Sequence, residues 1–269
     1  MQMTARALRL NDVVLRLISG IFIVALVLGS GWLNLWVFAA VVAVALVLAG
    51  WELGRLLVQA GYAASPSVIF SAGFAAALSL YLSAPWNTLC LSVLLLASLA
   101  WQLRRWRRRT VGDWAVSFAG GFYLGWTGGH LVLVRLGEQG WSWLLLTLIS
   151  VWLSDSAAYV FGHLLGRHKL APHISPGKTW EGYVSGAIAG LLGGAAMGML
   201  TPIGLPLGLV TGGLIGTLSV LGDLIESMIK RLAHAKDSGH LIPGHGGVLD
   251  RLDSLLWAGV IAYYVRVLL

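Results

Sequence analysis

Apolar residues fill long blocks of this chain, and most charged side chains lie in the short segments between the blocks. Each block has about the 20 residues that an α-helix needs to cross a bilayer. The pattern therefore predicts an all-α, polytopic integral membrane protein with about nine transmembrane helices. We expect the spans at about 13–31, 33–54, 66–83, 85–103, 113–134, 141–162, 181–200, 204–225 and 251–269.

The blocks divide the chain into two regions. Residues 1–140 hold about five N-terminal spans, and residues 141–269 hold the other spans with the polar groups and loops expected to be catalytic. No segment is left over for a separate soluble domain. Pro172, Pro176 and Gly177 interrupt helical structure, so we expect a loop or a partly submerged segment there. Glycines recur along the two spans that follow, which predicts close helix packing.

The composition agrees with a chain embedded in lipid. Hydrophobic residues make up 58% of it, charged residues 11%, and the mean hydropathy is +0.82, which excludes a soluble domain of ordinary composition. Cys90, the single cysteine, lies in an apolar block and is expected to be a small core residue. The first block follows basic residues, as in a signal peptide. No small-residue cleavage site follows it, so we expect a retained helix.

The positive charges predict the orientation of the chain. With the N-terminus in the cytoplasm and one crossing per span, all of the 18 Lys and Arg residues except Arg135 and Arg266 lie on the cytoplasmic side. This asymmetry follows the positive-inside rule and places the C-terminus outside. We interpret the basic cluster Arg104–Arg109 as an anchor at anionic lipid, and we expect no nucleic-acid partner.

Three polar groupings interrupt the apolar blocks, and all three lie at predicted cytoplasmic ends of spans. The first contains Asp155, which follows the run LTLISVWLS. A carboxylate at membrane depth is costly unless it faces a polar cavity or a partner. We therefore expect Asp155 to serve a functional site. The alternative is a structural, hydrogen-bonded aspartate.

The second grouping runs from Ser175 to Gly182 and reads SPGKTWEG. Ser175 is a suitable helix N-cap and Pro176 a suitable first helical residue. Free backbone amides and Lys178 would then form an anion site. The Gly-Lys-Thr triplet is not a P-loop, because that motif needs a glycine where Pro172 stands.

The third grouping includes the end of one predicted helix and the start of another. Helical spacing brings two sets of polar side chains onto one face each: Asp223, Glu226, Ser227 and Lys230, and then Asp250, Asp253, Ser254 and Trp257. Their carboxylates are hard oxygen ligands that suit Mg²⁺ beside substrate phosphates. The alternative is a set of ion pairs that holds the loops in place.

The stretch Ser227–Asp253 reads SMIKRLAHAKDSGHLIPGHGGVLDRLD. Its spacing, S-x-I-K-R-x4-K-D-x-G-x2-I-P-x-H-G-G-V-x-D-R-L-D, resembles the signature of the CDP-diacylglycerol synthases, or phosphatidate cytidylyltransferases. In that family an S-P-x-K-T-x-E-G stretch precedes the signature, and the second grouping is similar to it. The resemblance covers about Leu148 to Trp257, and the earlier helices match only as apolar spans.

The resemblance implies an integral membrane enzyme of phospholipid biosynthesis, which transfers CMP from CTP to phosphatidate and gives CDP-diacylglycerol and pyrophosphate. It implies Mg²⁺ as the cofactor, with a second metal ion left open. It also implies a homodimer. We expect a bacterial-type inner (plasma) membrane and an active site at its cytoplasmic side.

The same resemblance assigns roles to residues of this chain. The metal is expected at Asp223 and Asp250, with Asp253 as a further ligand. The catalytic groups are expected to be Asp223, Asp250, Lys230, Arg231 and Lys236. Substrate binding is expected at Ser175, Lys178, Thr179, His245, Arg251 and Asp155.

Two other functions would use similar residues. An ion-coupled membrane transporter also has carboxylates at span ends and glycine-interrupted helices, but it would distribute the carboxylates through the bilayer depth. A CTP-dependent lipid kinase would leave the lipid phosphorylated and release CDP. Analysis of the products separates the kinase from the cytidylyltransferase.

A reporter fused after Leu269 tests the orientation. Because the basic loops are retained inside, we expect this reporter to be active only outside the cytoplasm. A second reporter, inserted within Arg104–Arg109, should be active only inside. Cytoplasmic activity of the Leu269 fusion would contradict the prediction of nine spans.

Overall fold

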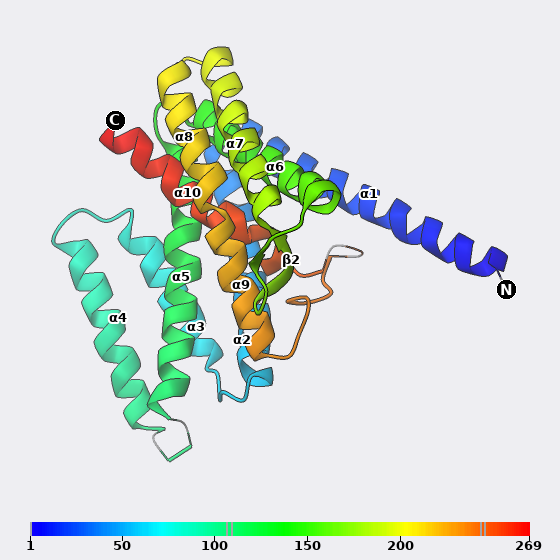
Figure 1. Ribbon diagram of the computed structural model, residues 1–269. Coiled ribbons are helices and arrows are strands. Elements are labelled where there is room, and N and C mark those ends of the chain that lie inside the picture. The colour runs from blue at the N-terminus through cyan, green and yellow to red at the C-terminus, as the bar shows by residue number, and fades with distance from the viewer. Residues whose placement is uncertain (1, 106, 109, 243, 245) are drawn as a thin grey trace.

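The computed structural model describes residues 2–105, 107–108, 110–242, 244 and 246–269, with the backbone only for residues 2–14 and 16. The described chain forms helices and one two-stranded hairpin (Figure 1). The helices are α1 (Gln2–Leu33), α2 (Leu35–Gln59), α3 (Pro66–Ser79), α4 (Trp86–Leu103), α5 (Val111–Leu136), α6 (Gly140–Leu165), α7 (Trp180–Leu200), α8 (Leu205–Leu218), α9 (Val220–Leu232) and α10 (Leu249–Leu268). The strands are β1 (Lys169–Ala171) and β2 (Ser175–Thr179).

The all-α prediction is confirmed apart from the hairpin, and each predicted span coincides with a helical region. The range predicted as 204–225 contains two helices, because Ser219 separates α8 from α9. Within the described residues, 5 helical stretches are long and apolar enough to cross a membrane: Leu35–Gln59, Trp86–Leu103, Gly140–Leu165, Trp180–Leu200 and Leu205–Leu232. The count of nine spans and the orientation of the termini stay predictions.

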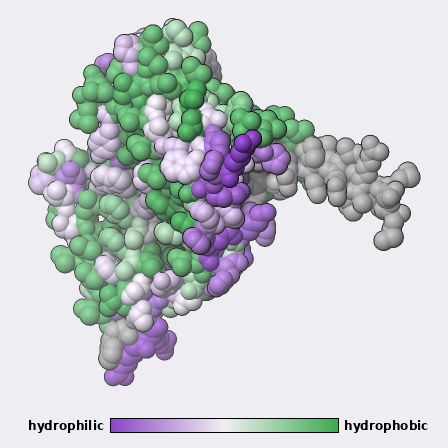
Figure 2. Space-filling model, in the orientation of Figure 1, coloured by the Kyte–Doolittle hydropathy of each residue, from purple (hydrophilic) through white to green (hydrophobic). Residues whose placement is uncertain are grey.

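Large apolar side chains cover the outside of the helices. Trp36 is 80% exposed, Phe74 71% and Leu192 62%. Figure 2 shows this hydrophobic surface interrupted by a hydrophilic area beside the hairpin and the loop between α9 and α10. Extended apolar surface of this kind marks contact with lipid. Together with the five apolar stretches, it indicates an integral membrane protein.

The hairpin confirms the predicted interruption before α7 and corrects its details. Lys169 pairs with Thr179, and Ala171 pairs with Ser175, in antiparallel register. The prediction that Ser175 caps a helix is therefore wrong. A residue before proline is driven towards extended backbone, which places Ser175 in β2. The N-cap of α7 is Thr179, whose Oγ1 accepts a hydrogen bond of 3.2 Å from the Gly182 amide.

Two clusters of buried apolar side chains hold the bundle together. One joins α2, α5, α6, α8 and α10, and Leu144 and Ile215 are completely buried in it. The other joins α2, α3, α5 and α10 around Leu56, Leu131 and Leu256. Helices α2, α5 and α10 contribute to both clusters, so the N-terminal and C-terminal halves share one core.

Helices α7 and α8 approach each other closely, as their glycines predict (Figure 1). A Cβ atom on Gly212 of α8 would overlap the backbone of Gly190 and Gly194 on α7. In the next position, a Cβ on Gly213 would lie 3.2 Å from the side-chain Cδ1 of Leu191. The helices can therefore pack this closely only because glycine, which has no Cβ atom, occupies the contact positions.

The two basic residues outside the predicted cytoplasmic segments bind helix ends. Arg135 Nε donates a hydrogen bond of 2.8 Å to the carbonyl of Gly31, in the last turn of α1. Arg266 Nη1 donates one of 3.1 Å to the carbonyl of Val134, in the last turn of α5. Cations stabilise the C-terminal ends of helices, where carbonyl groups lack helical partners.

The neighbouring glycines of α8 provide a matched test of the packing. Gly212→Ala should destabilise the protein by about 1–3 kcal/mol, because the added methyl group meets backbone atoms that cannot move aside. Gly213→Ala should have a smaller effect, since the flexible Leu191 side chain can adjust. Thermal unfolding in detergent measures both. Equal melting temperatures for the two variants would contradict the close contact of α7 and α8.

Candidate functional site

A polar cavity of about 790 Å³ lies between α6, α7, α9, α10 and the hairpin. All three polar groupings of the sequence contribute to its walls. The charged lining residues are Asp155, Lys169, Lys178, Asp223, Lys230, Asp237, Asp250, Arg251 and Asp253. The cavity therefore combines cations and carboxylates in a chain that is otherwise poor in both.

An ion pair connects the second grouping to the third. Lys178, near the end of β2, places Nζ 2.5 Å from Asp223 Oδ2 on α9. The other oxygen of Asp223 accepts a hydrogen bond of 3.2 Å from Ser227 Oγ, one helical turn further on. The side chains of Lys178 and Asp223 are 23% and 32% exposed, so water and a ligand can reach this pair.

A second set of charges connects α9 to α10. Lys230 Nζ lies 2.6 Å from Asp250 Oδ1 on α10 and 3.2 Å from Glu226 Oε2 on its own helix. The three side chains are 12%, 6% and 4% exposed. The other Glu226 oxygen, Oε1, is buried without a protein partner in the described structure. The predicted pairing along one side of α9 is confirmed by two contacts between residues one turn apart, Ser227 with Asp223 and Lys230 with Glu226.

The loop between α9 and α10 surrounds the second oxygen of Asp250. Oδ2 accepts hydrogen bonds from the Ser238 amide (2.9 Å), Ser238 Oγ (2.9 Å) and the Gly247 amide (2.8 Å). Asp250 lies in the first turn of α10, outside the five apolar stretches. Burial alone would raise the pKa of Asp250, but hydrogen bonds from Lys230, Gly247 and Ser238 lower it to about 2. The carboxylate is therefore ionised at neutral pH.

The cavity brings together most of the predicted site residues: Asp155, Ser175, Lys178, Thr179, Asp223, Lys230, Asp250, Arg251 and Asp253. Arg231 and Lys236 are exposed and do not line it. Arg231 donates to the carbonyls of Ile174, between the hairpin strands, and Ala235, so in this structure it connects α9 to the hairpin. His245 lies outside the described residues.

Two residues that hold the site together were not expected from the sequence. Glu52 on α2 accepts hydrogen bonds from Ser238, Val248 and Leu249, in and after the loop that contacts Asp250. Glu52 is the only acidic residue in the apolar range 33–54. The rule applied to Asp155, that an ionisable residue within an apolar span needs a partner, also applies to Glu52. No comparable feature of the sequence marks Ser238 as part of the site.

The donor set of the cavity fits a magnesium ion that also binds substrate. Among the described residues, no group of three or more His, Cys, Asp or Glu side chains is placed to hold a metal ion alone. Mg²⁺ commonly takes only one or two carboxylates and completes its shell with phosphates and water. Asp223, with two protein donors and partial exposure, retains accepting capacity. Asp250 Oδ1 accepts a hydrogen bond from Lys230 among the described residues.

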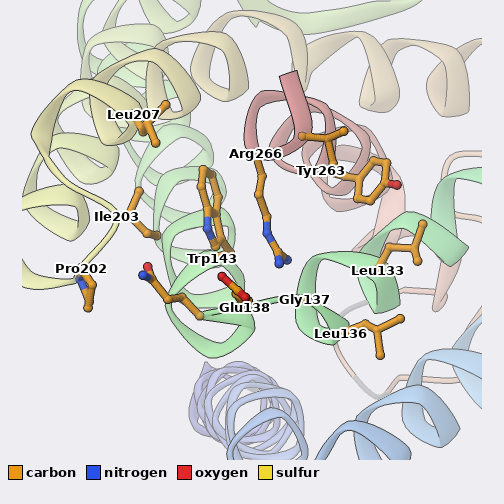
Figure 3. A pocket seen from close by; sticks show the side chains of 12 residues that line it. Leu133, Leu136, Gly137, Glu138, Trp143, Pro202, Ile203, Leu207, Tyr263 and Arg266 are labelled. Atoms are coloured by element: carbon orange, nitrogen blue, oxygen red, sulfur yellow. The ribbon is translucent and has the colours of Figure 1, made fainter. Parts of the chain in front are cut away.

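A second cavity, of about 560 Å³, lies elsewhere in the bundle. Figure 3 shows Trp143, Glu138 and Arg266 directed towards its interior. Its lining shares no described residue with the polar cavity. It contains one cation and one carboxylate, and Arg266 already binds the carbonyl of Val134. The polar cavity is therefore the site with the chemistry for a multiply charged ligand.

The fold and the cavity define a class of protein, namely a polytopic helical membrane protein with a charged cavity suited to phosphate groups. Residues 14–269 match the family model described as "Cytidylyltransferase family". The chain belongs to this family. The match extends over the N-terminal helices as well as the three polar groupings.

Bacterial relatives named phosphatidate cytidylyltransferase are similar to part of the chain. The Brucella suis biovar 1 protein is 42% identical over 147 residues, which are 54% of this chain and 54% of the relative. The Haemophilus influenzae protein is 48% identical over 120 residues, 42% of this chain and 41% of the relative. The Synechocystis protein is 38% identical over 189 residues, 60% and 64% of the two chains. The first of these alignments therefore spans about half the length of the relative.

Lys178 is the cation whose removal tests the anion site most directly. Lys178→Ala should weaken the binding of CTP by about tenfold or more, the effect of losing one charged hydrogen bond. Arg167→Ala is the matched control, since it removes a nearby cation that does not line the cavity. Equilibrium binding of labelled CTP to purified protein measures both. Equal affinity of Lys178→Ala and the unmodified protein would remove Lys178 from the anion site.

Proposed function

We propose that this chain is a phosphatidate cytidylyltransferase, an enzyme that joins CTP to phosphatidate. An oxygen of the phosphatidate phosphate forms a bond to the α-phosphorus of CTP. The bond from this phosphorus to the β-phosphate breaks, and pyrophosphate leaves. The products are CDP-diacylglycerol and pyrophosphate. The observation that carries the proposal is the convergence of Lys178, Asp223, Lys230 and Asp250 in one cavity of a cytidylyltransferase-family chain.

The proposed reaction needs charge neutralisation more than it needs a base. A phosphate monoester is ionised at neutral pH, so the nucleophile carries its charge before it attacks. Lys178, Lys230 and Arg251 line the cavity and would bind the phosphates of the two substrates. Cations held before the reaction stabilise the charge that develops during it. The ion pairs to Asp223 and Asp250 hold two of these cations in place.

We propose that the enzyme depends on Mg²⁺, held by Asp223 and Asp250 with Asp253 close by. The ion would offset the negative charge of the triphosphate and of the leaving pyrophosphate. Asp155 lines the same cavity and would be available as a ligand of a second metal ion. The oxygen ligands of these residues are of the type that Mg²⁺ prefers.

The proposal extends to the surroundings of the enzyme. We place the chain in a bacterial-type inner membrane with the cavity on the cytoplasmic side, where CTP arrives from water and phosphatidate from the bilayer. The basic residues near the predicted cytoplasmic surface favour this orientation. A homodimer is part of the same proposal.

Product analysis with two labels tests the reaction. Purified protein is incubated with phosphatidate and CTP, labelled at either the α- or the γ-phosphate, with and without Mg²⁺. The α-label should enter the lipid only with Mg²⁺, and the γ-label should leave as pyrophosphate. Transfer of the γ-label to lipid would instead indicate a lipid kinase. No label in lipid under any condition would overturn the proposal.

Asp223 provides the clearest test of the metal site. Asp223→Asn should lower kcat by about a hundredfold, the effect of losing one electrostatic stabiliser of a transition state. The melting temperature should change little, because Asn can still accept a hydrogen bond from Lys178. Glu138→Gln, at the second cavity, is the control for loss of an acidic residue. Near-normal turnover of Asp223→Asn across a magnesium titration would contradict a metal-binding role.

A further inference from the structure

Glu52 is a completely buried carboxylate on an apolar helix. It lies on α2, in the stretch Leu35–Gln59, and its exposed fraction is 0%. An ionised carboxylate in such a place is costly unless it is hydrogen-bonded. Three donors surround it: the Val248 amide at 3.0 Å from Oε1, and the Leu249 amide at 2.9 Å and Ser238 Oγ at 3.0 Å from Oε2. All three belong to the loop before α10 or to its first residue.

The contact is a helix cap supplied from a distant part of the chain. The first amides of a helix have no partner within it. Val248 and Leu249 stand at the start of α10, where the Val248 side chain cannot cap the helix. Glu52 accepts hydrogen bonds from both amides, although it precedes Val248 by 196 residues and Leu249 by 197. The start of α10 is therefore fixed to α2.

Two glycines allow the loop to approach Glu52 this closely. A Cβ on Gly239 would lie 2.6 Å from Glu52 Oε1. A Cβ on Gly247 would overlap Glu52 Oε2 and Ser238 Oγ. Both loop glycines thus lie directly against the Glu52 carboxylate, and a side chain at either position would displace the loop or the carboxylate.

The same loop groups connect Glu52 to Asp250. Ser238 Oγ lies 3.0 Å from Glu52 Oε2 and 2.9 Å from Asp250 Oδ2. The Ser238 and Gly247 amides both donate to Asp250 Oδ2. Glu52 therefore holds the loop groups that contact Asp250, and it is not among the described residues that line the cavity.

We propose that Glu52 is a positioning residue of the active site. Its carboxylate fixes the loop between α9 and α10, so that the loop amides orient Asp250 towards Lys230 and the cavity. The proposal rests on the proposed function, since it assigns Asp250 to the reaction. A leucine at position 52 would leave Ser238 Oγ and the Val248 and Leu249 amides without this acceptor, and a buried donor without a partner is costly. A carboxylate at this place serves the loop rather than the core.

The test uses Glu52→Gln in the full chain. Gln keeps the shape but replaces one oxygen by an NH₂ group, which then faces an amide or hydroxyl donor. We expect kcat to fall about 10- to 100-fold, the scale of losing a residue that orients a metal or substrate ligand. The KM for CTP should change much less. Hydrogen exchange should accelerate at the amides of 247–249 and remain slow in α5.

A matched control and a double variant separate positioning from stability. Val42→Ala removes buried atoms from the same helix, in the other apolar cluster, and should lower the melting temperature without changing turnover per folded molecule. Glu52→Gln introduced into Asp250→Asn should cost little further activity, because both act through one carboxylate. Independent effects would multiply.

Three results would each overturn the role proposed for Glu52. These are normal turnover per folded molecule in Glu52→Gln, unchanged exchange at 247–249, and multiplied losses in the double variant. If the unmodified protein forms no lipid-linked cytidine, the proposed function fails by itself. The exchange experiment needs no substrate and then decides on Glu52 alone: faster exchange confined to 247–249 supports its hold on the loop, and unchanged exchange refutes it.

Discussion

The pairing of Lys230 with Asp250 is the interaction on which the rest of the site depends. Both side chains are largely buried, and Glu226 adds a second carboxylate beside the same ammonium group. A buried charge that loses its partner is strongly destabilising. Helices α9 and α10 must therefore meet where these charges pair. Their register then places Asp223 and Asp253 on the walls of the same cavity.

The second ion pair extends this constraint to the hairpin. Lys178 belongs to β2, and its contact with Asp223 holds the strand against α9, while Arg231 binds the carbonyl of Ile174 in the same hairpin. The cavity is thus closed on several sides by charged contacts. In the proposed reaction, the substrate phosphates would bind cations that the carboxylates have already oriented, so little reorganisation would be needed when negative charge develops.

The sequence allowed the helices to be predicted, because the apolar blocks are long and the charges between them are few. It also indicated which side chains share a helix face, since residues 223–230 and 250–257 are local in sequence. The helix cap at Thr179 was not predicted, because Ser175 before Pro176 satisfies the same local rules. The contact of Arg231 with Ile174, 57 residues away, has no local signature. The break at Ser219 carries neither proline nor glycine and could not be located from composition.

The N-terminal helices do more than anchor the chain. Helix α5 contacts α10 through a hydrogen bond of 3.1 Å from Trp257 Nε1 to the Tyr123 hydroxyl, and α2 caps α10 through Glu52. The same three helices share both apolar clusters. α10 carries Asp250, Arg251 and Asp253, so its position decides the geometry of one cavity wall. Because polar contacts inside an apolar bundle are costly to leave unmade, the early helices fix that position, although the recognisable motifs all lie in the later half.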